Sequence, residues 1–169
     1  MKPRQTKVPL IISNSAISPE VLLALSSGSF LQIFKGLGAK TVVDVDLGSE
    51  IALRYGHNSA LLWRPDGKQL ACGLQSKAFT FFTVDGTRVF DKTYQRNLYD
   101  MTFGPDNKYF VTVGSFGFEV FNADGTFGTF QRHSPFAATL LGCAFSPDGS
   151  LFAVCGTNHD PAQIFDAGT

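Results

Sequence analysis

Apolar residues alternate with polar or small residues in many short segments of the chain. The clearest apolar pairs have a spacing of two and end two residues before a proline: Leu61 and Trp63, Met101 and Phe103, and Cys143 and Phe145. A spacing of two puts both side chains on one face of a β-strand. The run most similar to a helix, Val21 to Leu25, follows a proline turn and ends in Ser-Ser-Gly, so we expect a buried strand there. The pattern predicts an all-β fold.

One turn phrase follows these strands and occurs four times, as Ser18-Pro19-Glu20, Arg64-Pro65-Asp66-Gly67, Gly104-Pro105-Asp106-Asn107 and Ser146-Pro147-Asp148-Gly149. Its proline presets the backbone for a turn and cannot donate a hydrogen bond to a sheet, so each strand has to end there. A second turn, Asp85-Gly86 or Asp124-Gly125, has the composition of a type I′ hairpin. The prolines recur every 40 to 46 residues, and a repeat of about 40–45 residues is typical of a propeller blade with four short strands.

The repeats predict one domain over residues 1–169, a partial β-propeller of about four blades built from four-stranded antiparallel sheets. We place blade one at about residues 6–50, blade two at about 57–94, blade three at about 96–134 and an incomplete blade four at about 137–169, which lacks its outer strand. The first strand of blade one is expected at Val8–Ser13. An unrelated β-sandwich would also have short strands and glycine turns, but it would not repeat one phrase in register.

Two parts of the chain carry a family resemblance. Leu61 to Gly67, and Cys143 to Gly149 with Leu151 to Val154, resemble the WD-repeat β-propeller family. The resemblance extends over nearly the whole chain and is weakest in the first repeat. The chain departs from the family pattern because no Trp-Asp pair ends a third strand, and because His57 and His133 stand at different distances from their prolines. At most one of them is in the position of the family's structural histidine. The resemblance implies a scaffold that binds other proteins and has no chemistry of its own.

The charge balance and the apolar content narrow the possible partners. The chain has 14 basic and 14 acidic residues, so nothing in its charge favours nucleic acid or an anionic membrane surface. No apolar stretch is long enough to span a bilayer, and the run from Val8 to Ile12 is too short, with Pro9 inside it, for a signal peptide. We therefore expect a cytoplasmic protein that neither inserts into a membrane nor binds nucleic acid.

Candidate catalytic and metal-binding residues are few. The aspartates that follow the turn prolines recur once per repeat, so they are expected to shape the turn. The three histidines have no metal-ligand spacing. Cys72, Cys143 and Cys155 form an odd set without paired spacing, which argues against a disulfide or a zinc site. Cys143 and Cys155 stand at apolar strand positions, so buried, reduced thiols are expected. We predict no catalytic residue, no metal and no cofactor.

The exposed loops carry the residues predicted to bind a partner: Arg54, Tyr55, Tyr94, Arg96, Tyr99 and Arg132. Tyrosine and arginine are enriched at the centres of protein interfaces. The segment Tyr94 to Asn97 joins the second blade to the third, and in propellers such links lie on the face with the narrower channel mouth, a frequent docking surface. The alternative is that these six are ordinary solvated loop residues.

The predicted strand count implies an open arrangement. Four blades in a row, the last lacking a strand, leave an apolar blade face bare at each end and a strand edge unpaired. We therefore expect an excerpt of a longer protein, or a half-ring completed by another polypeptide, either a further propeller segment or a second copy. The preferred function is a scaffold that assembles proteins in a cytosolic complex. The alternatives are a portion of an enzyme propeller (a hydrolase or an oxidoreductase) and a structural subunit of a large assembly.

Overall fold

The computed structural model describes residues 14–17, 22–27, 30–35, 40–46, 61–74, 78–94, 97–115, 117–124, 126–132, 139–157 and 162–167. These residues contain β-strands and no helix. The strands form four antiparallel sheets, and within each sheet they lie in the order of the chain. The predicted all-β class with blade-like antiparallel sheets is confirmed.

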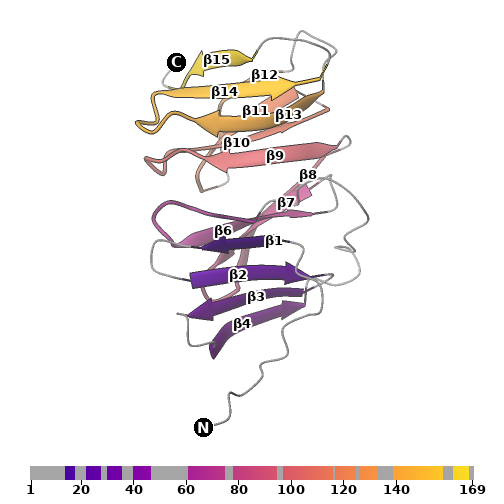
Figure 1. Cartoon of the computed structure of the whole chain (residues 1–169), viewed down its shortest axis with the longest axis vertical. Coiled ribbons are helices and arrows are strands. Elements are labelled where there is room, and N and C mark those ends of the chain that lie inside the picture. The colour runs from indigo at the N-terminus through magenta and orange to yellow at the C-terminus, as the bar shows by residue number, and fades with distance from the viewer. Residues whose placement is uncertain are drawn as a thin grey trace.

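The four sheets are arranged along the long axis of the molecule, with sheet 1 at one end and sheet 4 at the other (Figure 1). Sheet 1 consists of β1 (Asn14–Ile17), β2 (Leu22–Ser27), β3 (Phe30–Lys35) and β4 (Lys40–Asp46). Sheet 2 consists of β5 (Leu61–Trp63), β6 (Gln69–Leu74), β7 (Ala78–Thr83) and β8 (Arg88–Thr93). Sheet 3 consists of β9 (Leu98–Phe103), β10 (Tyr109–Gly114), β11 (Gly117–Asn122) and β12 (Phe127–Arg132). Sheet 4 consists of β13 (Leu140–Phe145), β14 (Leu151–Gly156) and β15 (Gln163–Asp166).

The number of strands in each sheet follows the expectation. Within the described residues, sheets 1 to 3 have four strands each and sheet 4 has three. This agrees with three complete blades and a fourth that lacks its outer strand. The residue limits assigned to the blades stay predictions.

The first strand of sheet 1 was expected at Val8–Ser13, which lies outside the described residues. The strand that pairs with β2 is β1, Asn14–Ile17. The first strands of the other sheets all end two residues before the turn proline, at Trp63, Phe103 and Phe145. Ile17 has the same spacing from Pro19. The prediction was based on the apolar run before β1. The observed strand ends two residues before its proline, as the first strands of the other sheets do.

The recurring phrase forms the turn between the first two strands of sheets 2, 3 and 4. Its last residue has a φ of 72° at Gly67, 61° at Asn107 and 75° at Gly149, a left-handed conformation that glycine and asparagine tolerate best. The N–H of that residue donates to the carbonyl three residues earlier, at 2.8 to 3.1 Å. In all three turns the aspartate accepts a hydrogen bond of 3.0 Å from the N–H two residues after it. The aspartates thus shape the turn, as expected.

The hydrophobic core lies between successive sheets. We call the side of a sheet that packs on the preceding sheet its front face, and the side that packs on the following sheet its back face. Leu31 and Ile33 of sheet 1 cluster with residues of sheet 2: Leu61, Trp63, Leu70, Cys72 and Phe82. The cluster between sheets 2 and 3 includes Ala71, Phe79, Phe81, Met101, Phe103, Phe110 and Phe121. The cluster between sheets 3 and 4 contains Val111, Val113, Phe118, Val120, Leu140, Phe152 and Val154.

The three cysteines are free thiols that differ in burial. Cys72 is buried, Cys143 is half-buried and Cys155 is exposed. The expectation of a buried thiol is therefore wrong for Cys155. Its neighbour Val154 packs toward sheet 3, so alternation along β14 puts Cys155 on the back face of sheet 4, which is open to solvent.

Candidate protein interface

The loops of the molecule gather at the two ends of its strands. Because neighbouring strands are antiparallel, the turns between the first and second strands and between the third and fourth strands lie at one end. We call this end the turn surface; it comprises Arg64–Gly67, Asp85–Gly86, Gly104–Asn107, Asp124 and Ser146–Gly149. We call the other end the linker surface; it comprises Asn97, Tyr99, Ser115 and Arg132.

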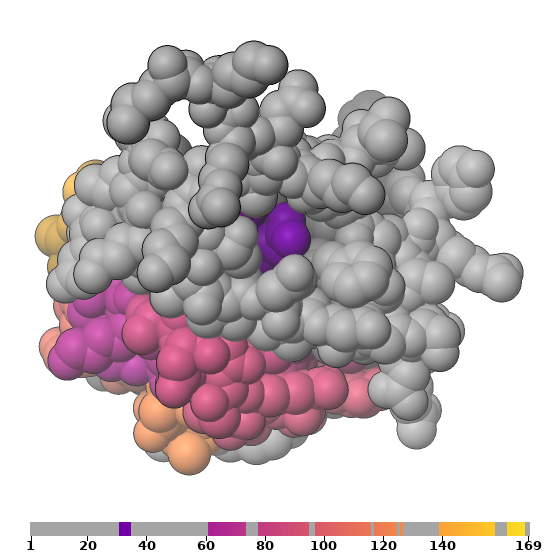
Figure 2. All heavy atoms as spheres, turned by 90° about the horizontal axis from the view of Figure 1, so that it is seen from below, coloured from indigo at the N-terminus to yellow at the C-terminus, as the bar shows by residue number. Residues whose placement is uncertain are grey.

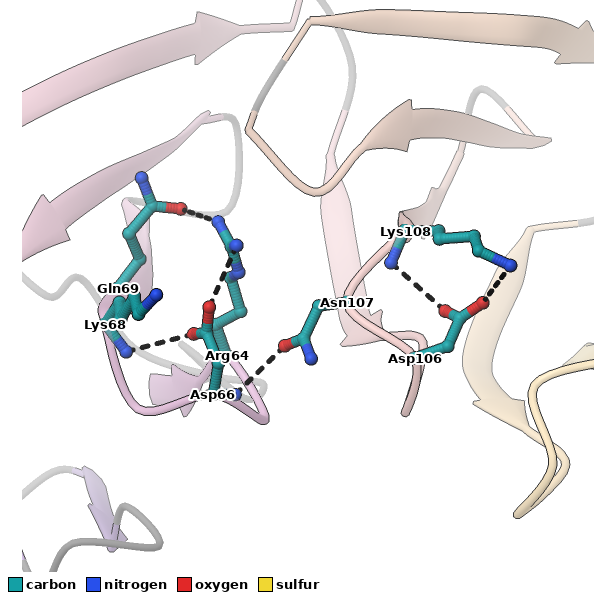
Figure 3. A network of polar contacts seen from close by, with 7 residues as sticks. All are labelled: Arg64, Asp66, Lys68, Gln69, Asp106, Asn107 and Lys108. Atoms are coloured by element: carbon teal, nitrogen blue, oxygen red, sulfur yellow. Dashed lines mark hydrogen bonds and ion pairs between the residues drawn. The ribbon is translucent and has the colours of Figure 1, made fainter.

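A side-chain hydrogen bond ties the turn of sheet 2 to the turn of sheet 3. The side-chain oxygen of Asn107 accepts a bond of 2.9 Å from the backbone nitrogen of Asp66 (Figure 3). Glycine occupies the corresponding position in the turns of sheets 2 and 4, at Gly67 and Gly149. Asparagine also tolerates the left-handed backbone of this position, and it adds a carbonyl group that glycine lacks. Asparagine in place of glycine at this position therefore makes the hydrogen bond between the two turns possible.

Arg64 is held within the turn of sheet 2 by two partners. Its Nη1 donates to Oε1 of Gln69 at 2.9 Å, and its Nη2 lies 2.9 Å from Oδ2 of Asp66 (Figure 3). The side chain is half-buried, and its Nε is buried without a hydrogen-bond partner among the described residues. These contacts fix the guanidinium group at the surface between the two turns.

A cavity of about 430 Å³ lies beside this guanidinium group. Its lining comes from both sheets: Arg64, Asn107, Lys108, Tyr109, Asn122, Ala123 and Asp124. Lys108 also pairs with Asp106, at 3.2 Å between Nζ and Oδ2 (Figure 3). Hydrogen bonds from Thr126 lower the pKa of Asp124, and the charge of Arg64 lowers it further. The cavity thus offers charged and carboxamide groups in fixed positions, which suits the binding of a polar segment.

The turn surface continues from sheet 3 to sheet 4 through direct packing. A Cβ atom added at Gly149 would lie 3.3 Å from Cγ of Pro105 and 3.5 Å from Cγ of Asp106. Gly149 also has a φ of 75°, so a side chain there would be both crowded and strained. The turns of sheets 2, 3 and 4 therefore form one connected row.

The six residues predicted to bind a partner are only partly covered by the structure. Arg54, Tyr55 and Arg96 lie outside the described residues. Tyr99 is half-buried on β9, and its hydroxyl accepts a hydrogen bond of 3.2 Å from Nδ2 of Asn97. Hydrogen bonds from Asn97 and Ser115 lower its pKa. Arg132 is the last residue of β12, at the same end of sheet 3.

Tyr94 lies in the core between sheets 2 and 3. It is 8% exposed, and its hydroxyl lies 2.8 Å from Oγ1 of Thr112 on β10. Burial is the main cause of the raised pKa of Tyr94. Nζ of Lys92 lies 5.5 Å from the centre of the Tyr94 ring and 3.8 Å from Oε2 of Glu119. Tyr94 thus joins the segment before β9 to the second strand of sheet 3 and presents little surface to a partner.

A carboxylate in the first strand of sheet 3 joins this sheet to sheet 4. Oδ2 of Asp100 accepts a hydrogen bond of 3.1 Å from the backbone nitrogen of Cys143. Burial raises the pKa of Asp100, and the bonds from Cys143 and Met101 offset part of that rise. This contact was not predicted from the sequence. The available signal was an acidic residue inside a mainly apolar strand.

The described part of the chain has neither a side-chain cluster that could hold a metal ion nor a helix that could span a membrane. No group of three or more His, Cys, Asp or Glu side chains there could hold a metal ion. No helix there reaches the length and apolarity that a membrane crossing requires.

Comparison with known proteins identifies one repeat unit. Residues 125–160 match the family model described as WD domain, G-beta repeat. The match spans β12, β13 and β14, and so takes in the outer strand of sheet 3 and the first two strands of sheet 4. No curated protein matches the chain. The matched repeat, set in an all-β molecule of antiparallel blade-like sheets, confirms the predicted resemblance of this chain to the WD-repeat family.

Proposed function

We propose that this chain is a non-catalytic protein–protein interaction scaffold that assembles other proteins in a cytosolic complex. The observation that carries the proposal is the WD repeat at residues 125–160, because WD repeats suggest interaction scaffolds and proteins that contain them are typically non-enzymatic. The turn surface adds support, since it is a row of turns held on sheets with an aromatic-rich core.

The cavity between the turns of sheets 2 and 3 is the preferred docking position. Its guanidinium, ammonium, carboxamide and carboxylate groups favour a polar loop of a partner protein over an apolar helix. Arg64 and Asn107 are already held by hydrogen bonds, so they would lose little conformational freedom on binding. The linker surface, with Tyr99 and Arg132, is the second candidate position.

Cross-linking of the tagged full chain in cells, followed by quantification of the attached proteins, tests the proposal. Lys108→Glu should reduce the yield of the specific partners because it reverses a charge at the cavity. Lys68→Glu is the matched control, since Lys68 stands at the same position of the turn in sheet 2 and does not line the cavity. Loss of partners on Tyr99→Ala, with no effect of Lys108→Glu, would move the site to the linker surface.

Co-purification of the tagged chain without a cross-linker separates the alternative functions. A scaffold is expected to release its partners at moderate salt, because polar contacts at a surface are screened. A structural subunit of a large assembly would become insoluble when its neighbours are removed. Absence of any protein cross-linked above background would contradict the scaffold, and turnover of a hydrolase or oxidoreductase substrate would favour an enzyme. Recovery of the tagged chain outside the cytosolic fraction would contradict the proposed location.

A further inference from the structure

The cavity between the turns of sheets 2 and 3 contains two asparagine side chains whose amide orientations are fixed. Oδ1 of Asn107 accepts the backbone N–H of Asp66 at 2.9 Å (Figure 3). A backbone N–H can only donate, so the amide oxygen must be on that side and Nδ2 on the other. Nδ2 has no hydrogen-bond partner among the described residues, and Asn107 is half-buried. Asn107 therefore offers the cavity an N–H donor.

The amide of Asn122 has the opposite orientation. The Thr126 hydroxyl donates its one hydrogen to Oδ1 of Asp124 at 2.7 Å. Oγ1 of Thr126 can therefore only accept from Asn122, whose Nδ2 lies 2.8 Å away. This contact fixes Nδ2 of Asn122 toward Thr126. Oδ1 of Asn122 accepts no hydrogen bond from the described part of the chain, so Asn122 offers the cavity an acceptor.

Asp124 adds a second acceptor next to Asn122. Its Oδ1 also accepts the backbone N–H of Thr126, at 2.9 Å, so both bonds from Thr126 go to one oxygen. Oδ2 receives no hydrogen bond from a described residue, and Asp124 is exposed. The bonds from Thr126 and the charge of Arg64 lower the pKa of this carboxyl. Asp124 is therefore ionised at neutral pH and can only accept.

The two cations that line the cavity act as hydrogen-bond donors more than as net charges. Nη2 of Arg64 lies 2.9 Å from Oδ2 of Asp66, and Nζ of Lys108 lies 3.2 Å from Oδ2 of Asp106. Neither aspartate lines the cavity. Each cation is thus neutralised by its own turn and keeps N–H groups that are not used in that pair. The donors of the cavity come from the two proline turns, and the acceptors come from the end of β11 and the hairpin after it.

We propose that the cavity binds a neutral carboxamide, the side chain of a glutamine or an asparagine in a loop of a partner protein. The carbonyl oxygen of this group accepts from Asn107 and Lys108, and its NH₂ group donates to Asn122 and Asp124. A carboxylate would leave the acceptors of the cavity facing another acceptor, and an ammonium group would leave the donors without a partner, which costs affinity. The proposal rests on the docking function proposed above and names the group that docks.

The size and the position of the cavity suit such a ligand. Its volume of about 430 Å³ is ample for one side chain and part of the loop that carries it. Parts of sheet 2 reach the molecular surface when the molecule is viewed from the end of sheet 1 (Figure 2, magenta and pink). A partner loop can therefore approach the turn of this sheet from solvent.

A display library of random peptides, selected on the purified full chain, tests the proposal. Peptides that bind the wild type and do not bind Lys108→Glu should share a glutamine or an asparagine at one position, because this variant replaces a donor of the cavity with an acceptor. In a selected peptide, exchange of that glutamine for glutamate, or of that asparagine for aspartate, keeps the shape and removes the NH₂ group. This exchange should weaken binding by about 10- to 100-fold, as measured by calorimetric titration.

Asp124→Asn provides a test that does not depend on loss of binding. Its amide oxygen can keep both bonds from Thr126, so the group that faces the ligand changes from an acceptor to a donor. The variant should therefore bind the acidic form of the peptide at least as tightly as the carboxamide form. Asp85→Asn is the matched control, since Asp85 accepts the same kinds of bonds from Thr83 and Thr87 in the hairpin of sheet 2 and does not line the cavity. This control should keep the preference for the carboxamide.

Three results would overturn the proposal. Selected peptides that depend on Lys108 but share a charged residue, or no residue, would leave the cavity as the docking position and exclude the carboxamide as its ligand. A carboxamide preference that Asp124→Asn leaves unchanged would mean that Asp124 does not contact the ligand. If no selected peptide depends on Lys108, docking at this cavity is itself contradicted. Circular dichroism establishes that each variant folds.

Discussion

The side-chain oxygen of Asn107 accepts a hydrogen bond of 2.9 Å from the backbone nitrogen of Asp66, 41 residues earlier in the chain. This bond connects two repeats through Asn107, which stands where the turns of sheets 2 and 4 have glycine. Asn107→Gly keeps the left-handed backbone and removes the bond, so the free energy of unfolding should fall by about 1 kcal/mol. Asn107→Ala should cost about 1–2 kcal/mol more, because alanine is strained at a positive φ. Urea unfolding of both variants measures the difference; equal losses would mean that backbone strain is unimportant at this turn.

The hydroxyl pair of Tyr94 and Thr112 gives a second test. Tyr94→Phe leaves Oγ1 of Thr112 buried without this partner, and the free energy of unfolding should fall by about 1–3 kcal/mol. The double variant Tyr94→Phe with Thr112→Val removes both polar groups and should lose less than the sum of the two single changes. Tyr99→Phe is the control, because that hydroxyl is only half-buried, and its effect should be within about 0.5 kcal/mol. Additive losses in the double variant would contradict a direct bond.

Phe110 lies at the centre of the core between sheets 2 and 3. Its ring centre is 5.0 Å from those of Phe79 and Phe81 and 4.7 Å from that of Phe103. Phe110→Ala should lower the free energy of unfolding by about 3–5 kcal/mol, since the residue is fully buried. Phe145→Ala, at a half-buried site in the next contact, should cost less. A loss at Phe110 below about 1 kcal/mol would contradict the packing described.

The carboxylate of Asp148 should make stability fall at low pH. Hydrogen bonds from Ser146 and Ser150 lower its pKa to about 2 from an ordinary 3.8. Because the folded value is below the unfolded value, the contribution is complete above pH 3.8 and is lost as the pH falls through about 2. Asp148→Asn should therefore lower Tm at pH 7 and have little effect near pH 2. A difference in Tm that does not change between these pH values would contradict the assignment.

Asp100 should show the opposite dependence. Burial raises its pKa above the ordinary 3.8, so its contribution to stability falls as the pH rises from 3.8 through the folded value. Asp100→Asn keeps an oxygen that can accept from the Cys143 N–H and removes the buried charge. The variant should have a higher Tm than the wild type at pH 7, and the gap should narrow below pH 3.8. A lower Tm at pH 7 would mean that the charge itself strengthens the bond to Cys143.

The repeating phrase made the sheets predictable because its turn chemistry is local. Proline, aspartate and a residue with positive φ set each hairpin within a few positions, and the alternation of apolar residues then sets the faces. The spacing of two residues between the first strand and the turn proline also holds for β1, which ends at Ile17. The apolar run before β1 had suggested an earlier strand. Cys155 was misjudged because its position is apolar in the pattern, yet the face it occupies has no described sheet packed on it.

The candidate interface was much harder to predict, because it depends on contacts between repeats. Nothing near Tyr94 in the sequence indicates that its hydroxyl reaches Thr112, 18 residues later, so an aromatic residue in a linker resembled a docking residue. The cavity beside Arg64 forms because the turn of sheet 2 lies next to the turn and the third strand of sheet 3. Asn107 in place of glycine is the one local sign of that arrangement, and its meaning requires the neighbouring turn.

Trp63 is the single tryptophan of the chain, and it belongs to the cluster between sheets 1 and 2. Indole fluorescence of this protein therefore reports on that contact and on no other. In a molecule whose repeats touch mainly their neighbours, separate parts can loosen at different temperatures. A shift of the emission to longer wavelength would mark water reaching Trp63, whereas loosening between sheets 3 and 4 would leave the emission unchanged. Tryptophan fluorescence can therefore be used to follow the separation of sheet 1 from sheet 2 without any labelling.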